Sequence, residues 1–348
     1  MQHAKKIMGD VRSSQPELLT DLLRQVSRSF YLTLRVLPGA IGPQIGLAYL
    51  LARATDTVAD TEIISVAQRL EALRHLREAI SGTTNGLPQG GLGDLARQQG
   101  LPAERILLER IGEALELLRQ TDSADQCHIR EVLAIITSGQ ELDLRRFAGA
   151  DAQNIVALAN HEELDDYTYR VAGCVGEFWT RMCRTHLFPK ATLDDEALLR
   201  QGVRFGQGLQ WVNILRDLPR DLRQGRCYLP ADALRAQGLT PVELLQPSNE
   251  PKLRPLYNSY LDRAQAHLAA GWDYTLALPR SSARVRLACA WPILIGVDTL
   301  ARLRQGHVLD PAQRLKVTRS EVRQVVFQTL WRYPRRRAWQ RLFQDHAR

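Results

Sequence analysis

The chain has 348 residues, of which 45% are hydrophobic and 24% charged, and its formal net charge at pH 7 is +8. This length allows one large domain or two ordinary ones, and the composition is that of a soluble globular protein. The basic charge leaves nucleic acid, an anionic membrane face and an anionic substrate open as partners. No uninterrupted apolar stretch reaches about 18 residues, so no membrane-spanning helix is expected. Residues 1–10 lack the apolar core of a signal peptide.

The sequence contains five cysteines: Cys127, Cys174, Cys183, Cys227 and Cys289. None of them belongs to a CxxC pair, their number is odd, and their neighbours are typical of apolar helices. Disulfide frameworks and zinc sites use paired or regularly spaced cysteines. We therefore predict reduced structural thiols in a cytoplasmic protein.

Apolar residues recur with helical spacing along most of the chain, and neither strand alternation nor hairpin turn signals are evident. The expected helices cover residues 18–26, 44–60, 66–80, 103–119, 126–147, 165–187, 194–222, 253–278, 283–303, 322–331 and 335–343. The Gly-rich stretch 81–100 is expected to form a loop or a short interrupted segment, and 186–193 and 246–252 are expected to be inter-helix loops. These patterns predict an all-α single domain over residues 1–348, with a basic aromatic C-terminal segment at about 330–348.

The expected helix 44–60 ends in Asp56-Thr57-Val58-Ala59-Asp60. Asp56 and Asp60, which we call the first aspartate pair, are four residues apart and so share one helix face, with Cβ atoms about 5–6 Å apart. Arg53 lies on the same face. A single pair of this spacing also occurs by chance on solvated helix faces, so it is weak evidence alone.

A second pair, Asp217 and Asp221, lies on the expected helix 194–222. We call Asp217 and Asp221 the second aspartate pair. Asn213 and Gln210 precede it at helical spacing, so the four side chains form one polar stripe along the helix. Four arginines surround it: Arg216, Arg220, Arg223 and Arg226. Guanidinium groups suit phosphate oxygens, although surface salt bridging is the plain alternative.

Two aspartate pairs that face each other across a cavity can bind hard divalent cations through oxygen ligands. Magnesium held by a few carboxylates usually completes its coordination with substrate phosphates and water. The two pairs and their arginines therefore point to a diphosphate substrate.

Three residues are unusual for the helices in which they are expected. Gly173 and Gly176 weaken the expected helix 165–187 by roughly 1 kcal/mol each relative to Ala, which indicates either close helix packing or room for a ligand. Tyr167 lies before this weak point. Pro219 stands between the second pair of aspartates, where it either bends the helix or marks its end.

Four ordered motifs resemble the squalene and phytoene synthase family of class I isoprenoid synthases, between about Ser27 and Leu303. They are Ser27-Arg28-Ser29-Phe30, residues 53–60, residues 167–176, and residues 210–221 followed by 225–230. The resemblance implies a helical bundle around a central cavity.

Two features are similar to the squalene synthase branch: Ala54-Thr55-Asp56-Thr57-Val58 and Cys289-Ala290-Trp291-Pro292. The chain departs from eukaryotic squalene synthases in lacking acids at Ala59 and Thr61 and in lacking their C-terminal membrane anchor. The minimal aspartate pair remains.

The resemblance implies a farnesyl-diphosphate farnesyltransferase, which condenses two farnesyl diphosphates head to head through presqualene diphosphate to squalene, with Mg²⁺ and NADPH. The implied metal ligands are Asp56, Asp60, Asn213, Asp217 and Asp221. The implied diphosphate-binding residues are Ser27, Arg28, Phe30, Arg53, Gln210, Arg216 and Arg226. Tyr167, with Arg53, is the implied catalytic residue, and Lys316 and Arg319 resemble a stretch that contacts NADPH. The prenyl tails are expected near Phe30, Leu50, Val171, Val175, Leu209 and Pro292.

Three alternatives stay open at this point. The first is a dehydrosqualene or phytoene synthase that uses no reductant. The second is a non-catalytic family member that serves as an assembly subunit. The third concerns Tyr167, which could instead have a structural role as a core tyrosine whose hydroxyl is hydrogen-bonded.

The C-terminal run 331–339 mixes aromatic and cationic residues. Such a run suits the interface of an anionic membrane, whereas one short terminal patch is little for a nucleic-acid-binding protein. We predict no nucleic-acid partner, and a cytoplasmic protein that contacts the inner face of the membrane peripherally.

Overall fold

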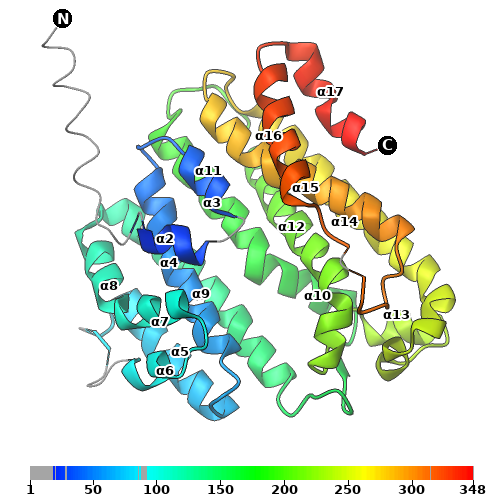
Figure 1. The fold of residues 1–348 in the computed structure, drawn as a ribbon. Coiled ribbons are helices and arrows are strands. Elements are labelled where there is room, and N and C mark those ends of the chain that lie inside the picture. The colour runs from blue at the N-terminus through cyan, green and yellow to red at the C-terminus, as the bar shows by residue number, and fades with distance from the viewer. Residues whose placement is uncertain are drawn as a thin grey trace, which may run out of the picture. The chain divides into compact units, whose positions relative to one another are not determined.

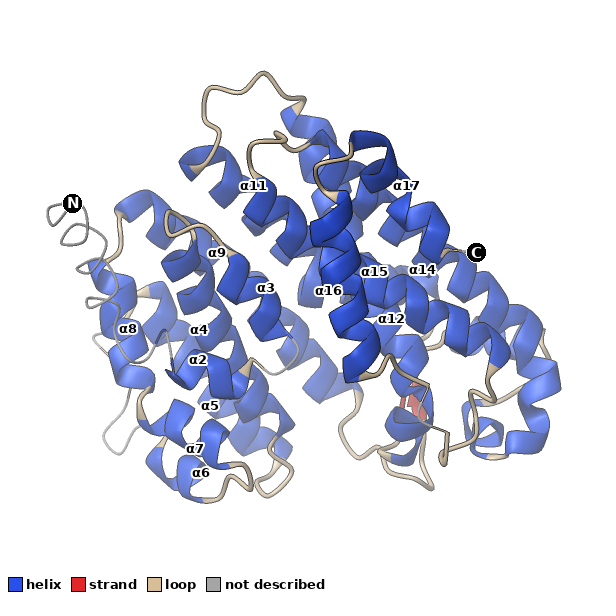
Figure 2. Cartoon of the chain, turned by 45° about the horizontal axis from the view of Figure 1, so that its top comes forward, coloured by secondary structure: helices blue, strands red, loops and turns tan. Residues whose placement is uncertain are grey.

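Helices make up most of the described chain (Figures 1 and 2). The computed structural model describes residues 19, 21–27, 30–84, 86–87, 92–313 and 315–347. The contacts divide the chain into two compact units, residues 1–137 and 138–348, with the boundary inside one long helix. The predicted all-α fold is confirmed, and the single domain stays a prediction.

The first unit is built around one apolar helix, α4. Its helices are α2 (Asp21–Val26), α3 (Tyr31–Val36), α4 (Gly42–Asp60), α5 (Val66–Ser81), α6 (Gly93–Arg97), α7 (Pro102–Glu109), α8 (Ile111–Gln120) and the first part of α9 (Ser123–Arg146). Leu50, Leu51 and Ala54 of α4 are fully buried. The helices that surround α4 therefore cover one of its faces and leave the other for polar residues.

One predicted helix of this unit is broken. The expected helix 103–119 is two helices, α7 and α8, which meet at Arg110. Leu107, Leu108 and Ile111 are all buried on either side of the break, so the apolar spacing continues through it. Gly112 lowers the helix propensity at this point. The spacing alone therefore did not predict the break.

The second unit is built around α12, which packs against α11, α14 and α15 (Figure 1). After the end of α9 its elements are β1 (Val156–Ala157), α10 (His161–Thr168), the π-helix η3 (Tyr169–Gly173), α11 (Cys174–His186), α12 (Asp195–Arg223), β2 (Arg226–Cys227), α13 (Ala231–Ala236), the 3₁₀ helices η4 (Pro241–Leu245) and η5 (Pro247–Asn249), α14 (Glu250–Ala277), α15 (Ala283–Gln305), α16 (Arg319–Arg332) and α17 (Arg336–His346). The two-residue strands β1 and β2 pair in parallel.

Two further predictions about this unit are wrong in detail. The expected helix 165–187 is α10, a π-helical turn and α11 in succession. The expected loop 246–252 contains η5 and the start of α14. Each difference reflects backbone geometry that apolar spacing does not encode.

Glycines allow two helices of the second unit to approach closely. A β-carbon on Gly176 would lie 1.8 Å from the carbonyl oxygen of Gly202, and one on Gly206 would lie 2.1 Å from the carbonyl oxygen of Ala172. Only glycine fits at such contacts. Close helix packing thus explains Gly176, and the π-helical turn that ends at Gly173 adds a local change of helix geometry.

Helix α12 continues through Pro219 to Arg223. Proline has no N–H, so it leaves the carbonyl of Leu215, four residues earlier, without its helical donor. The hydroxyl of Tyr257 on α14 donates to this carbonyl oxygen at 2.8 Å, inside the core. The second aspartate pair therefore lies on an unbroken helix, because a side chain of the neighbouring helix supplies the missing hydrogen bond.

The last two helices, α16 and α17, pack on α15, and α17 also contacts α14. The indole N–H of Trp291 donates to the hydroxyl of Thr329 at 2.9 Å, and the rings of Trp272 and Trp339 are 5.5 Å apart. All five cysteines are free, and only Cys127 is exposed. None of the described helices is both long and apolar enough to cross a membrane.

Candidate functional site

The first aspartate pair lies on the face of α4 opposite the buried core. The side chain of Asp56 is 46% exposed, and Asp60, the last residue of α4, is exposed. The hydroxyl of Thr57 donates to the carbonyl of Arg53 at 2.9 Å, and that of Thr61 to the carbonyl of Thr57 at 2.6 Å. The threonines are thus satisfied within the helix, and the carboxylates are the groups that α4 presents outward.

Arg53 links this pair to a second helix of the same unit. Its Nη1 lies 4.0 Å from Oδ2 of Asp56, and its Nη2 forms an ion pair with Glu104 of α7. Burial lowers the pKa of Arg53, but the hydrogen bond that Arg53 donates to Glu104 and the charge of Asp56 outweigh this effect and leave the pKa raised. The guanidinium is therefore a fixed cation one helical turn before Asp56.

The second aspartate pair is more buried than the first, and more charged side chains lie close to it. Arg216 forms a two-fold ion pair with Asp217, with Nε–Oδ1 and Nη2–Oδ2 distances of 2.8 and 2.5 Å. Burial, followed by the charge of Asp217, raises the pKa of Asp221 to about 7, although Arg220 and Arg226 act in the opposite direction. Without a further cation, the Asp221 carboxyl is hard to ionise beside the charge of Asp217.

A line of hydrogen bonds extends from Asn213, which precedes the second aspartate pair on α12, to Tyr167. The amide of Asn213 donates to Oε1 of Gln210 at 3.4 Å, and the amide of Gln210 donates to the hydroxyl of Tyr167 at 3.3 Å. The structure thus brings together the predicted residues Tyr167, Gln210 and Asn213, and α12 carries Asp217 and Asp221 onward along the same stripe.

Two residues that sequence reasoning missed complete this line. Tyr228 stacks on Tyr167 with ring centroids 4.6 Å apart, and its hydroxyl donates to Oδ2 of Asp143 at 2.7 Å. Tyr228 follows the second aspartate pair in a quoted motif, which was the available signal. Asp143 lies 85 residues before Tyr228 on α9, and its sequence neighbourhood carries no comparable signal.

The surroundings of Tyr167 keep its phenol protonated. Burial, and then the charge of Asp143, raise the pKa of Tyr167 well above its ordinary value, while Arg226 lowers it only slightly. A cationic neighbour is thus present in Arg226, but burial and the charge of Asp143 outweigh its effect on this pKa. Tyr167 is a neutral hydroxyl that donates or accepts hydrogen bonds rather than a preformed phenolate.

Arg226 is positioned by the short strand pair. Val156 of β1 pairs with Arg226 of β2, and Gly225 just before it has a φ of +78°. A β-carbon on Gly225 would lie 2.3 Å from the backbone nitrogen of Asp151. Both the conformation and the lack of space require glycine, which fixes the turn that leads from α12 to Arg226.

The remaining predicted residues are dispersed. Ser27 is buried, and its hydroxyl has no hydrogen-bond partner among the described residues; Phe30 stacks on Tyr49 with centroids 5.5 Å apart. Arg28 lies outside the described residues. Lys316 and Arg319 are exposed at and before the start of α16.

Of the residues expected beside the prenyl tails, Leu50 is fully buried in the core of the first unit. The others are partly exposed, as lining positions require: Phe30, Val171, Val175, Leu209 and Pro292.

The donor set fits magnesium, which prefers oxygen ligands. Each aspartate pair supplies two carboxylates, and no three acidic, histidine or cysteine side chains form a metal-binding cluster within the described ranges. The raised pKa of Asp221 is the observation that favours a cation there, because a divalent ion would relieve the repulsion from Asp217. That the two pairs share bridging ions stays a prediction.

The sequence model of the squalene/phytoene synthase family matches residues 23–321. The phytoene synthase of Arthrospira platensis is 27% identical over 309 residues, covering 87% of this chain and 85% of that protein. The squalene synthase ERG9 of Saccharomyces cerevisiae is 27% identical over 293 residues, covering 83% and 62%. The bifunctional lycopene cyclase/phytoene synthase of Blakeslea trispora is 31% identical over 222 residues, covering 62% and 33%. The chain spans about a third to two fifths of the length of such bifunctional relatives.

Solved structures share the fold. TcSQS in complex with the ligand BPH1237 superposes with a TM-score of 0.75 at 22% identity, covering 94% of this chain and 89% of that chain. A dehydrosqualene synthase in complex with a ligand gives a TM-score of 0.64 at 19% identity, covering 90% and 94%. At these identities the likeness shows the fold alone.

Proposed function

Since the chain belongs to the squalene/phytoene synthase family, we propose that it is a squalene synthase, which joins two farnesyl diphosphates head to head through presqualene diphosphate and reduces the product with NADPH. The family consists of head-to-head isoprenoid synthases that generally depend on divalent metal ions. The observation that carries the proposal is the polar stripe of α12, where Gln210, Asn213 and the second aspartate pair continue from the hydroxyl of Tyr167.

In this proposal Asp56, Asp60, Asn213, Asp217 and Asp221 hold the magnesium ions. Bound magnesium would neutralise the departing diphosphate as a Lewis acid. Arg53, Arg216 and Arg226 orient diphosphate oxygens through fixed guanidinium donors.

Tyr167 acts as a neutral hydroxyl whose direction is set by Gln210 and by stacking on Tyr228. Its high pKa means that it passes a proton on only when a stronger base, such as released diphosphate, accepts it. Partly exposed apolar residues, including Val175 and Leu209, keep water from carbocations.

The choice of squalene over related products rests on two sequence elements, residues 54–58 and 289–292. The competing proposal is a dehydrosqualene or phytoene synthase, since relatives of both kinds match the chain. The test supplies the purified protein and Mg²⁺ with farnesyl or geranylgeranyl diphosphate, with and without NADPH. Squalene that forms only with NADPH is the expected result. Dehydrosqualene as the final product despite NADPH, or phytoene from geranylgeranyl diphosphate, would overturn it.

The NADPH site is proposed at Lys316 and Arg319, whose exposed cationic side chains suit a nucleotide phosphate. The double substitution Lys316→Gln/Arg319→Gln should raise the KM for NADPH at least fivefold and leave release of the first pyrophosphate unchanged. Arg323→Gln, an exposed arginine farther along α16, is the matched control. An unchanged KM for NADPH would exclude this position.

A non-catalytic assembly subunit is the third possibility. The second aspartate pair lies on the polar stripe of α12, and Gln210 of that stripe donates to the hydroxyl of Tyr167, which argues against loss of the machinery. Failure of the purified protein to release pyrophosphate from farnesyl diphosphate with Mg²⁺ would favour the subunit.

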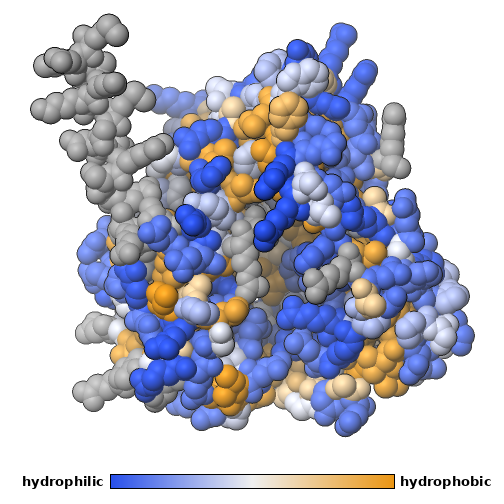
Figure 3. All heavy atoms as spheres, in the orientation of Figure 1, coloured by the Kyte–Doolittle hydropathy of each residue, from blue (hydrophilic) through white to orange (hydrophobic). Residues whose placement is uncertain are grey.

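We also propose that the surface of α16 contacts a membrane peripherally, in a cytoplasmic protein at the inner face. Phe327, Leu330 and Trp331 are each more than half exposed on one side of α16, and Figure 3 shows apolar surface over this helix, bordered by hydrophilic residues. The guanidinium of Arg335 lies 4.5 Å from the ring of Trp331. Trp339, in contrast, is only 2% exposed, so it belongs to the core and not to the proposed contact.

This contact is tested by flotation with vesicles of phosphatidylglycerol and phosphatidylcholine. Phe327→Ser/Trp331→Ser should abolish binding, whereas Val242→Ser, at another exposed apolar residue, should not. Undiminished binding of the double variant would exclude α16.

A further inference from the structure

A cavity of about 270 Å³ opens where α17 begins, and no residue of either aspartate pair lines it. Three guanidinium groups line it, from Arg280, Arg286 and Arg336, together with the rings of Tyr333 and Trp339. None of its lining residues is acidic. We call this cavity the arginine pocket.

Arg286, on α15, is the unusual member. Arg286 is only 6% exposed. Among the described residues, its guanidinium forms no ion pair with a carboxylate, and its Nε has no hydrogen-bond partner. Its guanidinium carbon lies 5.6 Å from the ring of Tyr333 and 5.7 Å from that of Trp339. Burial lowers the pKa of Arg286; the hydrogen-bonded hydroxyl of Tyr333 opposes this shift only in part, and the charge of Arg280 adds to it. A buried cation without an anion is costly, so the pocket lacks a compensating negative charge.

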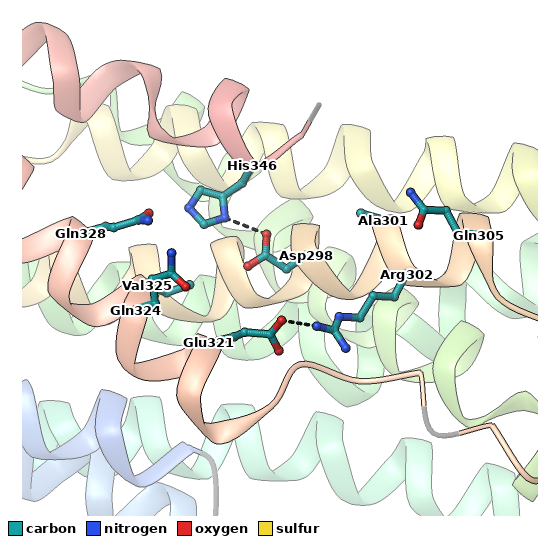
Figure 4. A pocket seen from close by; sticks show the side chains of 9 residues that line it. All are labelled: Asp298, Ala301, Arg302, Gln305, Glu321, Gln324, Val325, Gln328 and His346. Atoms are coloured by element: carbon teal, nitrogen blue, oxygen red, sulfur yellow. Dashed lines mark hydrogen bonds and ion pairs between the residues drawn. The ribbon is translucent and has the colours of Figure 1, made fainter.

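A neighbouring cavity of about 350 Å³ between α15, α16 and α17 shows the opposite arrangement (Figure 4). There Arg302 forms an ion pair with Glu321, and Nδ1 of His346 lies 2.7 Å from Oδ1 of Asp298. Both basic side chains that Figure 4 draws in that cavity, Arg302 and His346, have a carboxylate beside them. The arginine pocket therefore differs from the neighbouring cavity because no carboxylate lines it, so an anion from outside the chain could pair with its guanidinium groups.

The arginine pocket is also held in shape by the chain around it. Arg280 donates to the carbonyl of Pro334 at 2.6 Å, and the hydroxyl of Tyr333 donates to the carbonyl of Arg280 at 2.6 Å. These bonds tie the turn after α14 to the turn between α16 and α17. Arg336 is the first residue of α17, so the free N–H groups of the first turn add partial positive charge at the same place.

We propose that the arginine pocket binds a phosphate-bearing anion, at a site separate from the aspartate pairs. Guanidinium groups match phosphate oxygens in charge and in hydrogen-bond geometry, and a helix N-terminus favours the same ligands. Two kinds of molecule could supply this phosphate group. One is a soluble ion such as phosphate or pyrophosphate, and the other is a lipid headgroup of the membrane that α16 is proposed to contact.

The experiment uses the full chain in EDTA, so that metal-dependent diphosphate binding at the aspartate pairs is removed. Calorimetric titration with phosphate and with pyrophosphate tests the soluble source. Flotation with phosphatidylcholine vesicles, with and without phosphatidic acid, tests the lipid source. Neither readout depends on catalysis, so a failure here is distinguishable from a failure of the proposed synthase activity.

Arg280→Gln/Arg336→Gln removes two pocket cations whose residues are exposed, so it leaves the core intact. Arg337→Gln/Arg341→Gln removes two exposed arginines of α17 that do not line the pocket, and is the matched control. We expect the pocket variant to weaken phosphate or phosphatidic-acid binding at least tenfold and the control to change it less than threefold. Absence of binding to all probes, or an equal loss in both variants, would overturn the proposal.

Discussion

The two aspartate pairs have the same spacing but opposite surroundings. The first lies on an exposed face of α4, where Asp56 is close to Arg53, and Arg53 in turn is anchored by Glu104. The second pair is partly buried on α12, where Arg216 donates two hydrogen bonds to the carboxylate of Asp217. Burial and the charge of Asp217 raise the pKa of Asp221 to about 7. Identical spacing therefore does not imply identical electrostatics, and metal binding should affect the second pair more strongly than the first.

The largest effect on activity is expected from substitutions that remove one carboxylate from either aspartate pair. Asp56→Ala or Asp217→Ala should lower the rate of pyrophosphate release at least 10³-fold, about 4 kcal/mol in activation free energy, because the leaving group loses its counter-charge. Circular dichroism should show an intact fold. Asp273→Ala, at an exposed carboxylate on α14, is the control. Near-normal turnover of either variant would contradict the metal assignment.

The second prediction concerns pH and isolates the second pair. The native pKa of Asp221, about 7, lies above the ordinary value near 3.9, so the native state binds this proton more tightly than the unfolded chain. The resulting stability is complete below about pH 4 and is lost as the pH rises through about 7. In EDTA at pH 8, Asp221→Asn should therefore be more stable than the unaltered protein, by roughly 2–4 kcal/mol.

Urea unfolding at pH 4.5 and pH 8 measures this difference, which should shrink at the lower pH. Magnesium should also stabilise the unaltered protein more at pH 8 than at pH 6, because it competes with the proton of Asp221. Asp56→Asn is the control at the exposed pair. A stability gain of Asp221→Asn that does not depend on pH would refute the shift.

The third prediction tests Tyr167, whose hydroxyl accepts a hydrogen bond from Gln210 of α12. Tyr167→Phe should lower kcat about 10- to 100-fold, about 1.4–2.7 kcal/mol, and leave KM for farnesyl diphosphate within about twofold. Tyr274→Phe, which also removes a buried hydroxyl of the second unit, should leave kcat nearly unchanged. A larger effect on KM than on kcat would assign Tyr167 to packing.

The fourth prediction concerns the support of α12, since the second pair depends on a helix that contains proline. Tyr257→Phe should lower the free energy of unfolding by about 1–3 kcal/mol, because the carbonyl of Leu215 is left unsatisfied in the core. Pro219→Ala restores an N–H at that carbonyl, so it should reduce the cost of Tyr257→Phe. Additive losses in this double-mutant cycle would show that the two residues are independent.

The smallest expected effect concerns the support of the first pair. Glu104→Gln keeps a hydrogen-bond acceptor for Arg53 but removes the charge that anchors it. The KM for farnesyl diphosphate should rise about two- to fivefold, less than about 1 kcal/mol, with kcat preserved. Glu109→Gln on the same helix is the control, and a change in kcat of more than tenfold would give Glu104 a more direct role.

Much of this organisation was predictable from sequence. Apolar spacing located α4 and α12 almost to the residue, and four-residue spacing placed each aspartate pair on one helix face. The break at Arg110 was not predictable, because the buried positions continue across it.

The partners of Tyr167 were only partly predictable. Gln210 was found because it continues a stripe along one helix. Asp143 was missed because its contact with Tyr228 joins residues that are far apart in the chain, and such contacts depend on how helices pack. The raised pKa of Tyr167 follows from burial among these partners, which residue types alone do not reveal.

The π-helical turn Tyr169–Gly173 has a consequence for how this segment tolerates change. Compared with an α-helix, such a turn accommodates one additional residue, which shifts the angular phase of everything beyond it by about 100°. Deleting a single residue here would let the segment relax to ordinary α-helix, but Tyr167 and Gly176 would then no longer face their present neighbours at the same time. The length of this five-residue stretch is thus constrained more tightly than its composition, and indels should be rarer in it than substitutions.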